Sequence, residues 1–411
     1  MGLTPMEQRY TRPDWVRRLN AMGPAAGGAE RMVPLVAGHL VDHARASTGV
    51  DDPGDLGDGD WEGRLRALVE AVDASDLHVV GRMLTREELL RSLRTRLLMA
   101  DARRRDPGIA EEVIEAPIVV TGPARSGTTI LFELLGLDPG VRTPIATDVL
   151  HPAPPPGTTP EEVTAMTEAE QELWADVQPE FASIHELRSD LPVECITIGV
   201  PSFAGSHWPM LLADLGSWVP DVAADLAFHR AVLQTVQRGR EPRRWLLKTP
   251  GYLTMLDDLF AAYPDVCIIQ THRDPAKTMP STVSTVAMIQ WLRTDHVELD
   301  AIAPLIGAVF GDALTTVGRR RLDGSLPDRF GDLRFTDLMA SPADAIAGAY
   351  AGIGREMVPA HRDAVAAYLR DKPRGKHGAH RYTAEDWGFD ADALRAELGE
   401  YMARFEVAVE D

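Results

Sequence analysis

Residues 122–129, with the sequence GPARSGTT, combine two glycines at G-x-x-x-x-G spacing with an arginine and three hydroxyl side chains. They follow the β-branched run Ile118-Val119-Val120 and precede a helix-like stretch that stops near Asp138-Pro139-Gly140. A glycine-containing loop between a strand and a helix leaves backbone N–H groups free to converge on an anion, and the helix adds its positive N-terminal end. The segment predicts a phosphate-binding loop, with these candidate ligands: Arg125, Ser126, Gly127, Thr128 and Thr129.

This loop lacks one residue that a nucleoside-triphosphate site requires. Such a site has lysine after the second glycine, to reach the outer phosphates, and then serine or threonine for magnesium. Here Thr128 stands in the lysine position, and the positive charge lies inside the loop at Arg125. The pattern argues against an ordinary ATPase or kinase. It favours a phosphoester that carries a less charged transferable group, such as a sulfuryl group, which fixed donors and one cation can stabilise without a metal.

A second basic element follows another strand-like segment. Residues 266–281 read VCIIQTHRDPAKTMPS, so a buried strand delivers Arg273 to the carboxyl edge of a sheet, where ligands of open α/β sheets bind. Ser281 follows eight residues later, in or before the next helix. A guanidinium fork and a hydroxyl make a suitable receptor for a terminal phosphate.

The composition limits the partners. The 411 residues are 45% hydrophobic and carry a formal net charge of -20, so nucleic acid is not expected as a partner. An anionic nucleotide could therefore bind only where basic side chains gather locally, in a basic island on an otherwise acidic protein. The two cysteines exclude a disulfide framework and a cysteine-based zinc site. We see no secretory signal and no apolar run of about 18 residues. We expect a cytoplasmic protein without stable membrane insertion.

The remaining sequence predicts an α/β fold with a mostly parallel sheet flanked by helices. Residues 1–112 have helical periodicity, clearest at 61–72 and 86–98, and are interpreted as a helical cap. Residues 113–411 form the second predicted domain. The strand, polar loop, helix order of 118–137 recurs at 245–250, 266–275 and 333–342. An insertion over about 150–240 is expected to form an acceptor pocket and to cross the sheet as a surface segment at 152–178.

Taken together, the two phosphate elements resemble those of sulfotransferases that use 3'-phosphoadenosine-5'-phosphosulfate (PAPS), specifically the bacterial branch. The loop resembles the 5'-phosphosulfate element, and Arg273 with Ser281 resembles the 3'-phosphate element. The stretch KPRGKHG at 372–378 is similar to the family's basic C-terminal loop, which adds Arg374, Gly375 and Lys376 as expected PAPS ligands. LLKTP at 246–250 and HRYTAEDWGF at 380–389 extend the resemblance over nearly the whole chain. It implies PAPS as donor, the bisphosphate PAP as product, and no metal.

Candidate catalytic residues follow from the same comparison and from side-chain chemistry. Lys248, at the end of a buried strand, is predicted to stabilise the bridging oxygen of the leaving phosphate. The general base is open, because Pro250 and Tyr252 stand where relatives carry histidine. Asp148 matches the position of a glutamate in carbohydrate-modifying relatives. His185 has a side chain suited to accepting a proton near neutral pH, and the nearby Glu194 could orient it.

The acceptor and the oligomeric state are not defined by the sequence. We expect a hydroxyl on a small molecule or a lipid. Aromatic residues suggest an apolar acceptor pocket, although such residues also build cores: Trp174, Phe181, Phe203, Trp208, Trp218 and Phe228. Two alternatives remain, a P-loop kinase-like phosphotransferase and a non-catalytic nucleotide-binding module.

Overall fold

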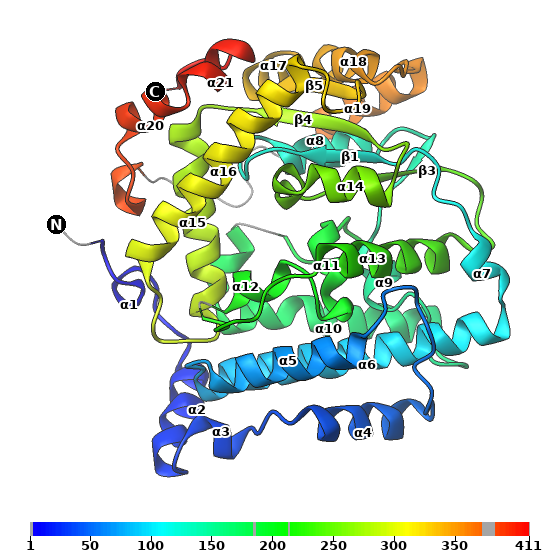
Figure 1. Cartoon of the computed structure of the whole chain (residues 1–411), viewed down its shortest axis with the longest axis vertical. Coiled ribbons are helices and arrows are strands. Elements are labelled where there is room, and N and C mark those ends of the chain that lie inside the picture. The colour runs from blue at the N-terminus through cyan, green and yellow to red at the C-terminus, as the bar shows by residue number, and fades with distance from the viewer. Residues whose placement is uncertain (1–2, 184–185, 213, 372–382, 411) are drawn as a thin grey trace.

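The strands form one five-stranded parallel sheet, which lies in the upper part of the molecule as drawn in Figure 1. The computed structural model describes residues 3–183, 186–212, 214–371 and 383–410. Its strands follow the order β2-β3-β1-β4-β5, and every neighbouring pair is parallel. They are β1 (Ile118–Thr121), β2 (Val141–Arg142), β3 (Arg244–Lys248), β4 (Cys267–His272) and β5 (Phe330–Arg334). The predicted α/β class is confirmed; the two-residue β2 was not anticipated.

Both faces of the sheet are covered, which explains the uniformly apolar strands. Side chains alternate between faces, so Val119 and Leu247 belong to one hydrophobic cluster while Val120 and Leu246 belong to another. The first cluster is completed by α13, α14, α16 and α21, and the second by α8, α18 and α19. The sheet and these helices thus form a three-layer sandwich with the sheet in the middle.

The strand order defines where a ligand can bind. β1 lies in the centre, with β3 on one side and β4 on the other, so the chain changes direction around it. The register pairs Val120 with Lys248, and Thr121 with Gln270. The carboxyl ends of β1, β3 and β4 therefore lie side by side at a topological switch point, where open α/β sheets bind ligands.

The described residues up to Glu111 form helices joined by loops, as the helical periodicity predicts. Figure 1 shows α2–α6, coloured blue to cyan, on the far side of α10–α13 from the sheet. Leu65 and Leu93 from this segment share a hydrophobic cluster with Trp208 and Met288, so the cap and the rest of the chain build one core. The helices are α1 (Met6–Arg9), α2 (Asp14–Ala25), α3 (Ala29–Met32), α4 (Ala37–Thr48), α5 (Trp61–Ala74), α6 (Val79–Arg105) and α7 (Gly108–Glu111).

The middle of the chain corrects two expectations. Much of the expected surface segment is α10 (Pro160–Val177), and it begins at a capping box between Thr159 and Glu162, a helix signal that the sequence carries. Phe203 and Trp208 are fully buried in core clusters, so they do not line an open acceptor pocket. The other helices here are α8 (Thr128–Leu135), α9 (Ala146–Leu150), α11 (Cys195–Gly199), α12 (His207–Leu211) and α13 (Val222–Gln237), with short 3-10 helices η1 (Pro179–Ser183) and η2 (Val200–Ser202).

The last third of the chain supplies helices around the sheet. α16 is long and apolar enough to cross a membrane by length and composition alone. However, Phe310, Leu314 and Val317 on this helix belong to the main core, and core helices can meet the same criterion. The elements are η3 (Pro250–Thr254), α14 (Leu256–Ala262), α15 (Pro275–Trp291), α16 (Leu299–Leu322), α17 (Phe335–Ala340), α18 (Pro342–Gly352), α19 (Pro359–Asp371), η4 (Glu385–Trp387), α20 (Ala391–Glu397) and α21 (Gly399–Arg404).

Candidate active site at the carboxyl edge of the sheet

The loop after β1 has the backbone of an anion-binding turn. Gly122, Arg125 and Gly127 all have positive φ angles, of 138°, 65° and 88°. A Cβ atom on Gly122 would lie 2.3 Å from Thr271 Oγ1 and 2.6 Å from its carbonyl oxygen, so only glycine fits there. The non-glycine Arg125 in a left-handed conformation is the kind of local strain that collects at ligand-binding loops.

The loop leads directly into the N-terminus of α8. Gly127 is the N-cap residue, and no side chain caps this helix end, so the N–H groups of the first turn are available to an anion. Thr128 is buried, whereas Thr129 in the same turn is exposed. Three of the predicted phosphate ligands, residues 127–129, therefore lie at the N-terminus of α8.

Ser126 has a different environment from the other loop residues. Its side chain is fully buried, and its Oγ lies 2.5 Å from the carbonyl oxygen of Pro123 and 2.5 Å from Thr271 Oγ1. Its backbone N–H also donates to Pro123. The hydroxyl therefore ties the loop to β4, and these internal hydrogen bonds make Ser126 a brace of the loop rather than an open ligand.

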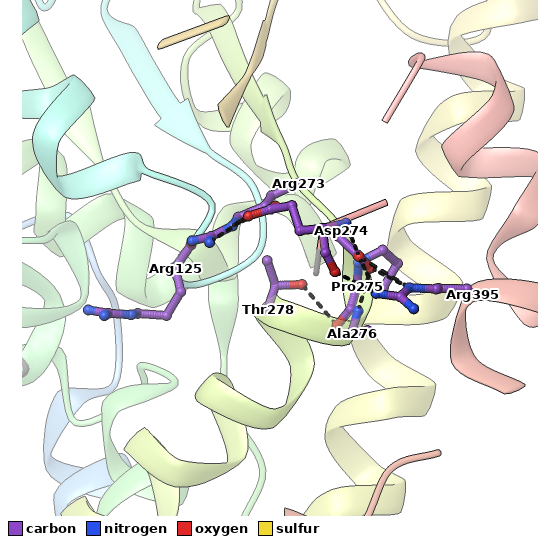
Figure 2. A network of polar contacts seen from close by, with 8 residues as sticks. Arg125, Arg273, Asp274, Pro275, Ala276, Thr278 and Arg395 are labelled. Atoms are coloured by element: carbon purple, nitrogen blue, oxygen red, sulfur yellow. Dashed lines mark hydrogen bonds and ion pairs between the residues drawn. The ribbon is translucent and has the colours of Figure 1, made fainter. Parts of the chain in front are cut away.

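Arg273 joins the second basic element to this loop. Its Nη1 donates to the carbonyl oxygen of Arg125 at 2.7 Å, and its guanidinium stacks on the Phe335 ring at 3.7 Å. Figure 2 shows the Arg125 side chain extending away from Arg273, so the two residues meet only through the Arg125 carbonyl. The two predicted phosphate elements are thus adjacent. A structure with Arg125 and Arg273 on unrelated surfaces would have excluded a shared nucleotide.

A buried ion pair fixes the segment that follows Arg273. Asp274 is fully buried, caps α15 through the Ala276 N–H at 2.9 Å, and pairs with Arg395 at 2.7 Å (Figure 2). Burial alone would raise the pKa of Asp274, but the hydrogen bonds from Arg395 and from the backbone N–H groups of Glu410 and Ala276, together with the Arg395 charge, outweigh burial and lower that pKa. This anchors the start of α15, whose second turn carries the buried Ser281.

Lys248 lies at the end of β3, beside the first turn of α8. Its side chain is 4% exposed, and Nζ lies 3.4 Å from Thr129 Oγ1. The same Nζ forms a 2.6 Å ion pair with Glu194 Oε1. An ammonium group is therefore held at the anion-binding helix end, next to a carboxylate.

The structure gives Glu194 a partner, Lys248, that the sequence did not suggest. Residues 189–193 pair with 144–147 through Ala146 N–H to the Leu191 carbonyl at 3.0 Å and Val193 N–H to the Pro144 carbonyl at 2.9 Å. This pairing ends directly before Glu194 and brings its carboxylate to Lys248. No local sequence signal gives this long-range pairing, so the sequence does not mark Glu194 as a candidate base.

The two predicted bases fare differently. Both carboxylate oxygens of Asp148 accept from Arg240 at 2.7 Å, and Arg240 precedes β3, whose opposite end carries Lys248. Asp148 is therefore held by an ion pair and does not contact Lys248, which argues against its prediction as the base. His185 lies outside the described residues. So do three predicted PAPS ligands: Arg374, Gly375 and Lys376.

Tyr252 and Cys195 are buried in the hydrophobic cluster that contains Leu247 of β3, and both side chains remain neutral. Burial raises the pKa of Tyr252 well above its usual range and that of the Cys195 thiol to about 12. Neither can act as a proton acceptor near neutral pH. Among the described residues, no group of three histidine, cysteine, aspartate or glutamate side chains could hold a metal ion.

Three of the cations expected to form the basic island lie in the described part of the site. Arg125, Lys248 and Arg273 do gather around the loop and the first turn of α8. However, Lys248 is paired with Glu194, and Arg273 is paired with Glu410 at 2.8 Å. Two of the three cations thus carry a counter-ion in this structure, which the sequence did not reveal.

These features define an α/β protein with an anion-binding loop that contains one arginine and lies beside a second arginine and a buried lysine. A model of the sulfotransferase family matches residues 117–359, more than half of the chain and both phosphate elements. The chain belongs to the sulfotransferase family.

Curated relatives and solved structures agree with this membership. The omega-hydroxy-beta-dihydromenaquinone-9 sulfotransferases Stf3 of Mycobacterium bovis and Mycobacterium tuberculosis are each 25% identical over 292 residues, covering 67% of this chain and 73% of theirs. Sulfotransferase STF9 from Mycobacterium avium shares the fold, with a TM-score of 0.74 and 22% identity over 92% of this chain and 98% of that one. Sulfotransferase STF1 from Mycobacterium tuberculosis H37Rv also shares the fold, with a TM-score of 0.71 and 24% identity, over 89% of this chain and 98% of that one.

Proposed function

We propose that this enzyme transfers the sulfuryl group of PAPS to a hydroxyl group and releases PAP. The observation that carries the proposal is the contact between Arg273 and the phosphate loop, at 2.7 Å. It supports one nucleotide that spans both elements, with its 5'-phosphosulfate at the α8 N-terminus and its 3'-phosphate at Arg273 and Ser281. The threonine at position 128 supports a donor other than a nucleoside triphosphate.

Each charged group then has a defined task. The first-turn N–H groups of α8 and Arg125 hold the phosphosulfate, and Lys248 donates to the bridging oxygen as negative charge develops on it. The bond from sulfur to that oxygen breaks while the acceptor oxygen bonds to sulfur. The acceptor proton moves to the Glu194 carboxylate, which lies 2.6 Å from the lysine and so borders the reacting atoms. Positioning and electrostatics supply the remaining catalysis.

An apolar alcohol is the acceptor class that best fits the relatives. The name of the curated relatives specifies a hydroxylated menaquinone derivative, which is a lipid. We therefore extend the proposal to a lipid or similarly apolar alcohol, acting in the cytoplasm, where PAPS would be supplied. The aromatic residues of 150–240 that are not in the core remain candidates for its pocket, among them Trp174 and Trp218.

The test is sulfate transfer from ³⁵S-labelled PAPS to a panel of lipid alcohols, phenols and sugars, followed by chromatography of the products. We expect label on an apolar alcohol, and we expect ATP with magnesium to give no phosphorylated product. The variant Arg273→Ala should bind PAP at least about 30-fold more weakly, because a desolvated phosphate would lose its charged partner. Absence of transfer to every acceptor, with unchanged PAP binding by Arg273→Ala, would exclude the proposal.

A further inference from the structure

The guanidinium of Arg273 is already occupied by a carboxylate of the same chain. Glu410 contacts it through both oxygens: Oε1 lies 2.9 Å from Nε, and Oε2 lies 3.1 Å from Nε and 2.8 Å from Nη2. This is the two-pronged geometry in which arginine binds carboxylates and phosphates alike. With Nη1 bonded to the Arg125 carbonyl, every nitrogen of the guanidinium has a partner.

The backbone of Glu410 is held at the same place. Its N–H donates to Asp274 Oδ2 at 2.9 Å, and its carbonyl oxygen accepts from Arg395 Nη2 at 2.9 Å. These contacts align the Glu410 side chain with Arg273 by using the ion pair that also anchors α15. The carboxylate is therefore positioned from both its backbone and its side chain.

The segment around Glu410 is otherwise lightly packed. Ala408 and Val409 are exposed, and the Val409 side chain is among the most exposed large apolar groups that the structure describes, at 61%. The side chains of Arg273 and Glu410 are 21% and 20% exposed, so water and a ligand can reach the pair. Releasing Glu410 would leave the core residues Met402 and Phe405, further back in the chain, in place.

From this arrangement we propose that Glu410 is a built-in competitor for the 3'-phosphate of the nucleotide. The inference rests on the proposed function, in which Arg273 takes that phosphate. A dianionic phosphate and the Glu410 carboxylate cannot both use the Nε and Nη2 edge, and close like charges repel each other. Binding of PAPS or PAP displaces the carboxylate, and the affinity that is measured is the difference between the two pairings.

The consequence is that the C-terminal segment sets the nucleotide affinity of the enzyme. The effect is confined to ligands with a 3'-phosphate, because Glu410 does not contact the α8 N-terminus. Adenosine 5'-monophosphate, which lacks the 3'-phosphate, should be insensitive to Glu410. A change at Glu410 that alters the affinity for PAP but not for adenosine 5'-monophosphate would therefore identify competition for the 3'-phosphate.

The test is isothermal titration of PAP and of adenosine 5'-monophosphate into the unaltered protein and four variants. Glu410→Gln removes the charge and keeps the shape, and it should bind PAP about 5- to 10-fold more tightly, the scale of a part-exposed ion pair. Its affinity for adenosine 5'-monophosphate should not change. Glu400→Gln removes the same charge from an exposed site on α21 and should match the wild type for both ligands.

The other two variants separate this inference from the proposed function. Arg273→Ala should bind PAP more weakly, and Arg273→Ala/Glu410→Gln should match it, because without the guanidinium there is nothing to compete for. If Arg273→Ala loses affinity while Glu410→Gln binds PAP as the wild type does or more weakly, the competitor role is wrong and the proposed nucleotide site stands. If Arg273→Ala binds PAP normally, or the wild type does not bind it, the proposed function and this inference both fail.

Discussion

Replacing Glu194 by glutamine tests the assignment of the general base. The substitution keeps the size of a side chain whose Oε1 lies 2.6 Å from Lys248 Nζ, but it removes the ability to accept a proton. A positioned general base contributes about 10²- to 10⁴-fold to a rate, or about 3–5 kcal/mol of activation free energy. We therefore expect kcat to fall by at least about 100-fold in Glu194→Gln.

The same variant should not weaken nucleotide binding. Glu194 places a negative charge beside Lys248, so its removal should leave PAP affinity unchanged or raise it slightly. A fall in kcat with intact PAP binding distinguishes loss of the base from collapse of the site. A misfolded variant would lose both properties.

The assay is initial-rate transfer from labelled PAPS to the acceptor that the wild-type enzyme sulfates best in the panel, with PAP titrated separately. Asp148→Asn is the matched control, because it makes the same carboxylate-to-amide change at a residue that Arg240 holds. We expect its kcat to stay within about threefold of the wild type. Near-native kcat in Glu194→Gln would refute our reasoning, and a large loss in Asp148→Asn alone would restore Asp148 as the base.

Three further changes probe the site and the core. Lys248→Met keeps the aliphatic packing and should lower kcat by about 10²- to 10³-fold, with a smaller loss of PAP affinity because a cation beside the phosphates is removed; the same two assays measure both. Gly122→Ala puts a Cβ 2.3 Å from Thr271 Oγ1 and should lower the free energy of unfolding by about 2–4 kcal/mol in denaturant titrations. The control is Gly57→Ala, which should lower that free energy by less because no atom lies within 4 Å of the added Cβ. Burial raises the pKa of Asp225 to about 6, so ionisation of this carboxyl destabilises the fold as pH rises through 6. The free energy of unfolding of Asp225→Asn should therefore exceed that of the wild type by about 1–3 kcal/mol at pH 8 and should match it at pH 4. Equal differences at both pH values would contradict this prediction.

The elements that bind phosphate could be predicted because local sequence determines them. The β-branched run at Ile118, the glycines at 122 and 127 and the apolar strand before Arg273 each define their own backbone, and the parallel sheet then brings the strand ends together. Lys248 was placed correctly at the end of β3 by the same logic.

The partners of these cations could not be predicted because they come from distant parts of the chain. Glu194 reaches Lys248 through pairing of 189–193 with 144–147, and Glu410 reaches Arg273 from 137 positions away. Both are single glutamates in an acidic sequence, with no motif to mark them. The prediction of Asp148 rests on the position of a glutamate in relatives, and the structure pairs Asp148 with Arg240.

The direction of the Ser126 side chain could not be predicted from the sequence either. A serine in a phosphate loop suggests a ligand, yet its Oγ is used to fasten the loop to Thr271 on the neighbouring strand. Sequence spacing gives the residues of such a loop but not the direction in which each side chain points. That direction depends on β4, which lies about 145 residues further along the chain.

A crystal structure of the enzyme with PAP tests the central claim most directly. We predict one nucleotide across the carboxyl edge of the sheet, with its 5'-phosphate at the N-terminus of α8 and its 3'-phosphate on Arg273 in place of Glu410. A nucleotide bound elsewhere, or one whose 3'-phosphate does not touch Arg273, would contradict it.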